Sequence, residues 1–112
     1  MRALFVEMPA FERHRSSYLD DERFLALQLM LLREPEAGEV IKGTGGLRKV
    51  RFADKRRQKG KRGGLRIIYF WWATGGQFWL FTLYDKDEVD DLTPKERGVL
   101  KDMLKAELEA RQ

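Results

Sequence analysis

The chain has 112 residues, 43% of them hydrophobic and 12% aromatic, and a formal net charge of +4. This length suits one domain, residues 1–112, and the apolar content is enough to offset the entropy cost of ordering the chain. The chain contains no cysteine, which excludes a disulfide scaffold, a thiolate nucleophile and a cysteine metal site.

The sequence predicts neither a membrane span nor a signal peptide. The longest apolar runs, residues 24–32 and 65–73, are interrupted by Gln28 and Arg66 and fall short of the roughly 20 residues that a spanning helix needs. Glu7 lies where a signal peptide requires an unbroken apolar core. We therefore expect a soluble protein with a cytoplasmic location.

The N-terminal third is expected to form one strand and two helices. The apolar run at residues 2–7 predicts a strand, and Pro9 after it suits the first turn of a helix. Asp20 or Asp21 is a suitable N-cap for a second helix, whose wide apolar face ends before Pro35. Two helices with so short a connection predict a helical hairpin.

The remainder is expected to form three strands and a last helix. LRKVRF alternates in hydropathy, and LRIIYFWW and QFWLFTLYD bracket a glycine pair, which indicates a hairpin. Thr93, Pro94 and Glu96 form a capping-box pattern that opens the helix. The order β-α-α-β-β-β-α predicts an α+β fold, in which an antiparallel sheet packs against the N-terminal helical hairpin and the C-terminal helix.

Positive charge is concentrated in residues 42–66. This segment sums to +10, so the rest of the chain sums to −6. A charge run is most often a solvated surface, but unpaired cations are costly to bury and must face water or a polyanion. Gly60, Gly63 and Gly64 allow a phosphate to approach the backbone, which makes nucleic acid the favoured ligand. The cations are Lys42, Arg48, Lys49, Arg51, Lys55, Arg56, Arg57, Lys59, Lys61, Arg62 and Arg66.

Arg66 differs from the loop cations because it belongs to a predicted strand. Strand alternation places Arg66 and Ile68 on one face and Leu65 on the other. A guanidinium held by a strand is preorganised for bidentate contact with phosphate; the alternative is an ion pair with an acid of the last helix. Tyr84 and Lys86 are two residues apart near the end of the next strand, and Tyr84 alone would more often be a core residue.

Three segments together carry a resemblance to a known family. GTGGLRKVRFA, KGKRGGLRIIYF and LFTLYDKDEVDDLTPKE resemble the HigB branch of the RelE/ParE superfamily of bacterial toxins, and the resemblance spans nearly the whole chain. It implies a RelE-like fold and an endoribonuclease, an mRNA interferase that enters the ribosomal decoding site and inhibits translation. It also implies a cognate HigA-like helix-turn-helix antitoxin, through which alone the toxin would meet operator DNA.

The resemblance also implies roles for individual residues. Arg66 would stabilise the charge of a pentavalent phosphorane as the ribose 2′-hydroxyl attacks the phosphorus, a mechanism that requires no metal or cofactor. Lys59, Lys61, Tyr84 and Lys86 would orient groups or move protons. The cations that would bind RNA are Arg48, Lys49, Arg51, Lys55, Arg56, Arg57 and Arg62.

The chain departs from relatives that use histidine near this site, because its single histidine is His14. Without a matched acid–base pair, we expect slow cutting of free RNA and dependence on the ribosome for alignment.

Two alternatives remain open at this point. One is a nucleic-acid-binding module without catalysis, in which Tyr69, Trp71 or Trp72 stack on bases. The other is the gyrase-targeting, ParE-like branch of the same superfamily, against which the dense basic segment argues.

Overall fold

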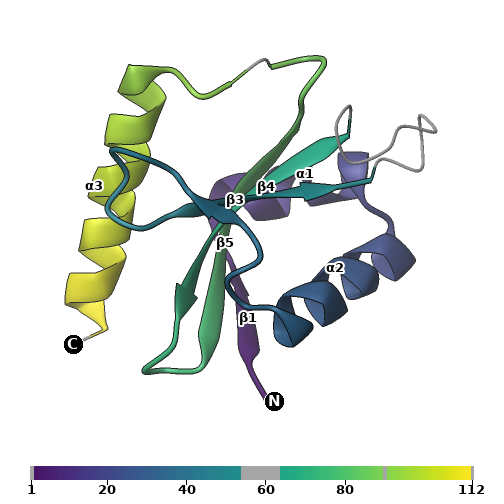
Figure 1. The fold of residues 1–112 in the computed structure, drawn as a ribbon, viewed down its shortest axis with the longest axis horizontal. Helices are drawn as coiled ribbons and strands as arrows, with labels where there is room; N and C mark the ends of the chain where they lie inside the picture. Colours follow the sequence, from purple (N-terminus) through teal and green to yellow (C-terminus); the bar gives the residue numbers. More distant parts are fainter. Residues whose placement is uncertain (1, 54–63, 90, 112) are drawn as a thin grey trace.

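The structure, a computed structural model, describes residues 2–53, 64–89 and 91–111. These residues form one five-stranded sheet in the order β1-β5-β4-β3-β2, with helices on both faces (Figure 1). The α+β fold expected from the sequence is confirmed. The elements are β1 (Leu4–Glu7), α1 (Pro9–Tyr18), α2 (Asp21–Arg33), β2 (Glu39–Val40), β3 (Arg48–Phe52), β4 (Leu65–Trp72), β5 (Gln77–Asp85) and α3 (Pro94–Ala110).

The sheet differs from the expected antiparallel meander at both edges. β3, β4 and β5 are antiparallel neighbours as predicted, but β1 pairs with β5 in parallel. A tight hairpin forces antiparallel pairing, whereas β1 is separated from its partner by both helices and is free of that constraint. The strand β2 was not predicted, because two residues inside a turn-rich connection show no alternation.

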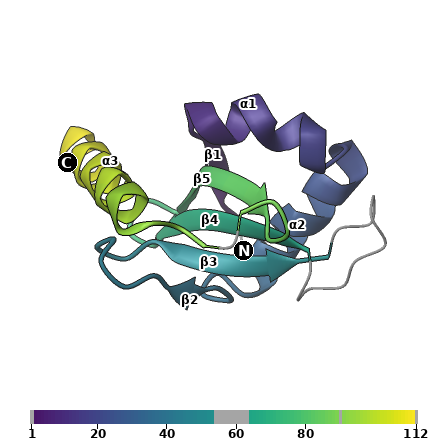
Figure 2. The same cartoon turned by 90° about the horizontal axis from the view of Figure 1, so that it is seen from above.

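The two faces of the sheet carry separate hydrophobic cores. One core packs β3, β4 and β5 against α1 and α2, and it includes Phe11, Leu27 and Leu31. The other packs the opposite face against α3 through Leu100 and Leu104. Figure 1 shows α2 and α3 on opposite sides of the sheet, and Figure 2 shows α1 beside β5. The central strands β4 and β5 are therefore covered on both faces.

Local sequence signals explain where the helices begin and where the chain turns. The Asp20 side chain accepts a hydrogen bond from the Arg23 backbone N–H at 2.8 Å, which caps α2. Both reciprocal bonds of the capping box between Thr93 and Glu96 are present at the start of α3. Gly76 has φ +64° in the turn between β4 and β5, a conformation that glycine adopts without steric cost. Among the described residues, no helix is long and apolar enough to cross a membrane.

Tyr69 fastens the connection after α2 to the sheet. Its side chain is fully buried, and its hydroxyl donates to the Pro35 carbonyl at 2.8 Å and accepts from the Gly38 N–H at 3.0 Å. A Cβ on Gly38 would lie only 2.9 Å from the Lys49 backbone, so the connection approaches β3 as closely as glycine allows. This packing positions β2 against β3.

We expect Tyr69→Phe to lower the free energy of unfolding by about 1–3 kcal/mol, because the buried Gly38 N–H and the partly buried Pro35 carbonyl lose their partner. Tyr18→Phe is the matched control, since the bond from its hydroxyl to Glu88 is long, at 3.4 Å, and exposed, and the loss should stay within about 0.5 kcal/mol. Urea unfolding of both variants measures the difference. Equal losses would show that the Tyr69 hydroxyl does not hold the connection.

Candidate functional site

Three residues form a row across the central strands. Arg66 on β4 is the register partner of Arg51 on β3 and of Tyr84 on β5. Their strand neighbours Leu65, Ile67, Val50, Phe52 and Leu83 all belong to the core under α1 and α2, so the row lies on the opposite face, the one that α3 covers in part. We call Arg51, Arg66 and Tyr84 the central row. The alternation predicted for Arg66 is confirmed.

Arg66 is buried although it carries a guanidinium. The residue is 3% exposed, and its Nη1 donates to the Leu65 carbonyl at 3.2 Å. Burial, followed by the like charge of Arg51, lowers the pKa of Arg66 from its ordinary value, while Tyr84, Asp85 and Asp87 act in the opposite direction. The protein thus holds a cation in the sheet where it is poorly hydrated, which strengthens its attraction for an anion.

Tyr84 is a buried phenol, and it is the register partner of Arg66. It is 8% exposed and packs in the core under α3. Burial, followed by the negative charge of Asp91, raises the pKa of Tyr84 to about 12, although the Arg66 charge works against this. At neutral pH the side chain is therefore a neutral phenol, whose hydroxyl can donate a hydrogen bond.

An ion-pair network borders the central row. Asp91 Oδ1 lies 3.4 Å from Lys49 Nζ, and Asp91 Oδ2 lies 3.3 Å from Arg97 Nη2. Lys49 is two residues before Arg51 on β3, so both side chains share the face of the row. The Leu92 backbone N–H donates to Asp91 Oδ1 at 2.7 Å; this bond and then the Lys49 and Arg97 charges lower the pKa of Asp91 despite its partial burial.

Lys86 and two acids lie where β5 ends. Lys86 is exposed, and its backbone N–H donates to the Gly64 carbonyl at 3.1 Å, next to the start of β4. Asp85 is fully buried and accepts a hydrogen bond from the Asp87 N–H at 2.8 Å. Two carboxylates therefore lie at the end of β5 and in the turn after it, close to the central row. The sequence left open an ion pair between Arg66 and an acid of the last helix. The acids whose charges act on Arg66, Asp85 and Asp87, precede that helix.

Arg48 lies apart from this group. Its register partner is Tyr69, whose side chain is in the core under α1 and α2. The Arg48 guanidinium donates to the Gly38 carbonyl and to Glu36 Oε2, both at 2.8 Å. The structure thus brings together Lys49, Arg51, Arg66 and Tyr84 on one face, and it places Arg48 on the other.

Six predicted site residues lie outside the described residues. They belong to residues 54–63, which follow β3 and precede β4 in the sequence. These six residues are Lys55, Arg56, Arg57, Lys59, Lys61 and Arg62.

The aromatic residues considered for base stacking are engaged in packing. Tyr69 is fully buried. The Trp71 ring stacks on Phe78 with centroids 4.4 Å apart, and Trp72 packs on Trp79 with centroids 5.3 Å apart. These contacts favour the core interpretation of these side chains over the stacking interpretation.

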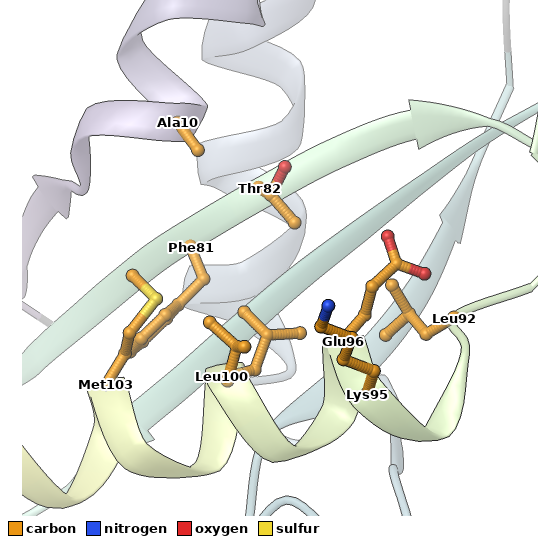
Figure 3. A pocket seen from close by; sticks show the side chains of 9 residues that line it. Ala10, Phe81, Thr82, Leu92, Lys95, Glu96, Leu100 and Met103 are labelled. Carbon is orange, nitrogen blue, oxygen red and sulfur yellow. The ribbon is translucent and has the colours of Figure 1, made fainter.

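An apolar groove lies beside the site, between β5 and the first half of α3 (Figure 3). Its volume is about 300 Å³, and Phe81 and Thr82 form part of its lining together with α3 side chains. Leu92 and Glu96 connect it to the site, because Leu92 follows Asp91 and the Glu96 charge acts on Tyr84. The remaining lining residues are Ala10, Lys95, Val99, Leu100 and Met103.

The sequence reasoning missed the acids and the helix arginine of the site. Asp85, Asp87, Asp91 and Arg97 were not selected, because their roles depend on contacts between distant segments. The sequence DKDEVDDL was the available signal, since its five acids stand at or just after the end of a predicted strand of a cationic site. Within the described residues, no cluster of three or more histidine, aspartate or glutamate side chains is suited to hold a metal ion.

These elements define a RelE-like α+β fold. The chain matches the structure of the E. coli toxin RelE, a variant with two arginine-to-alanine substitutions in the free state, with a TM-score of 0.54 and 14% sequence identity. The match covers 88% of this chain and 96% of that one. No family model matches the sequence. The fold expected from the sequence is thus confirmed.

Because the pKa of Tyr84 is raised, the free energy of unfolding should change with pH in the alkaline range. An unfolded tyrosine ionises near pH 10 and folded Tyr84 near pH 12, so the unfolded state loses its proton first and stability falls as pH rises through this window. Between pH 9 and pH 11, we expect the free energy of unfolding of the wild type to fall by about 1 kcal/mol more than that of Tyr84→Phe, which has no group that ionises at this position. Urea unfolding at both pH values measures it, and a constant difference would contradict the assignment.

Proposed function

We propose that this chain is the toxin of a type II toxin–antitoxin module, a HigB-like endoribonuclease that cuts messenger RNA on the ribosome and so inhibits translation in the cytoplasm. The observation that carries this proposal is the central row of Arg51, Arg66 and Tyr84 on one face of a RelE-like sheet. A poorly hydrated guanidinium beside a neutral phenol suits the charge and proton changes of phosphodiester cleavage.

The proposed reaction is a transesterification within the RNA. The ribose 2′-oxygen forms a bond to the adjacent phosphorus, the bond from phosphorus to the 5′-oxygen breaks, and the products are a 2′,3′-cyclic phosphate and a 5′-hydroxyl. Only RNA supplies this nucleophile. Arg66 stabilises the negative charge on the non-bridging oxygens, and Tyr84 donates its proton to the departing 5′-oxygen.

The lysines of the site take the remaining roles in this proposal. Lys59 or Lys61 accepts the 2′-hydroxyl proton, because crowding by like charges favours the neutral form of a lysine. Lys86 orients the nucleophile from the end of β5. Lys49 and Arg51 bind backbone phosphates, together with the cations in residues 54–63.

The burial of Arg66 bears on when the enzyme is active. Because Arg66 is only 3% exposed, its guanidinium contacts a phosphate only after the side chains that cover it move. Moving these side chains costs free energy. The ribosome can offset this cost, because it holds the messenger RNA with the 2′-hydroxyl aligned for attack, whereas free RNA is not positioned in this way. The proposal therefore includes dependence on the ribosome.

The proposed partner is a HigA-like helix-turn-helix antitoxin. Acidic residues of such a partner would neutralise part of the +10 segment at residues 42–66, and apolar residues would cover the groove beside the site. A partner that binds across both features blocks the approach of RNA.

Arg66→Ala should reduce cutting of ribosome-bound messenger RNA by about 10²- to 10³-fold, the usual effect of removing one donor that stabilises a developing oxyanion. Arg33→Ala is the matched control, because Arg33 is exposed at the end of α2 and its loss should leave the cutting rate unchanged. Primer extension on translating ribosomes measures both variants, and thermal unfolding confirms that each is folded.

The same variant separates the proposal from its rivals. A binding module without catalysis predicts no cutting by the wild type and a modest loss of RNA affinity in Arg66→Ala. A gyrase-targeting toxin predicts gyrase-dependent DNA breaks and intact messenger RNA. Arg66→Lys retains the charge, so it serves as a second test if Arg66→Ala does not fold.

Binding of single-stranded RNA should weaken with salt. Four to six phosphate contacts give a slope of log K against log[salt] of roughly −3 to −4 for a single strand. A titration of an uncleavable RNA at several salt concentrations measures the slope. Affinity that is independent of salt would exclude an electrostatic RNA site.

A further inference from the structure

We propose that Asp91 is a specificity-determining residue, an internal counterion that occupies the phosphate-binding positions of Lys49 and Arg97 and must leave before RNA binds there. This inference rests on the proposed function, because it assumes that the central row acts on RNA. It assigns a role in this site to the Asp91 carboxylate, whose removal should tighten RNA binding.

The geometry places the Asp91 carboxylate where a phosphate would lie. One oxygen is 3.4 Å from Lys49 Nζ and the other is 3.3 Å from Arg97 Nη2, so the two cations, from β3 and α3, are spanned by a single anion. A backbone phosphodiester offers the same pair of oxygens and the same single negative charge. Since Lys49 is two residues before Arg51 on the same face of β3, its contact with Asp91 lies beside the central row.

The contacts of Asp91 are of the kind that RNA can replace. Its side chain is 48% exposed, and those of Lys49 and Arg97 are 29% and 33% exposed. Ion pairs this long and this exposed are weak. By contrast, Arg48 and Glu36 on the opposite face pair at 2.8 Å. The carboxylate is thus a competitor that a phosphate displaces and not a fixed part of the core.

Other acids near Asp91 in the sequence also act on the residues of the site. The charges of Asp85 and Asp87 act on Arg66, and the charge of Asp91 acts on Tyr84. The described part of the site therefore combines the cations Lys49, Arg51, Arg66 and Arg97 with the carboxylates Asp85, Asp87, Asp91 and Glu96. In this part of the site the positive charge is therefore partly compensated, which lowers its affinity for arbitrary RNA.

The test variant is Asp91→Asn, which removes the charge and keeps an oxygen able to accept from the Leu92 N–H, now at 2.7 Å. The probe is a short single-stranded RNA with 2′-O-methyl groups, which cannot be cut. We expect affinity to rise about two- to tenfold, the sum of two exposed ion pairs, and the salt slope to steepen by roughly 0.7–1.4 as one or two cations gain phosphate contacts.

Two controls isolate the counterion effect. Asp102→Asn removes the same charge from an exposed position of α3 and should leave affinity and slope unchanged. In a Lys49→Met background, the gain from Asp91→Asn should shrink to less than about twofold, because one of the two released cations is absent. Asp91→Ser provides a second uncharged variant if Asp91→Asn does not fold.

The outcomes are separable from the proposed function. Unchanged or weaker binding by folded Asp91→Asn and Asp91→Ser overturns the inference, and so does an equal gain in Asp102→Asn or a full gain without Lys49. These results come from binding alone. Failure of the wild type to cut messenger RNA on ribosomes would instead overturn the nuclease function and leave the binding comparison intact.

Discussion

The placement of one guanidinium inside a sheet is the constraint on which the site depends. Arg66 lies on β4, a central strand, between Arg51 and Tyr84 on its two neighbours. Because strand alternation directs its side chain away from the core under α1 and α2, the cation cannot leave this face without a register shift that would invert every neighbouring side chain. The packing that stabilises the fold is therefore also the packing that positions the cation.

A buried cation needs a compensating negative charge, and the acids at and just after the end of β5 supply it. Asp85 and Asp87 act electrostatically on Arg66, and Asp91 bridges Lys49 and Arg97 at the edge of the same face. The raised pKa of Tyr84 follows from this arrangement, since burial and a nearby carboxylate both oppose its ionisation. The same acids thus stabilise the buried cation, lower the proposed affinity for RNA and keep Tyr84, the proposed proton donor, in its neutral form.

Much of the fold is predictable from local signals, and much of the site is not. Pro9, the Thr93 capping box and the glycine turn at Gly76 each act within a few residues, so the helices and the hairpin were predicted correctly. The parallel pairing of β1 and the Lys49–Asp91 contact join segments far apart in the chain, and no spacing pattern reports them. Alternation alone was enough to assign the face of Arg66, but not to reveal its acidic neighbours.

The most direct measurement of the central claim replaces the ribose 2′-hydroxyl at the cut position of a ribosome-bound messenger RNA with hydrogen. If the central row acts on a phosphodiester through attack by this hydroxyl, the deoxy substrate should remain intact while still bound, and the unmodified substrate should yield a 2′,3′-cyclic phosphate. Cutting of the deoxy substrate, or products with a 5′-phosphate, would contradict the account.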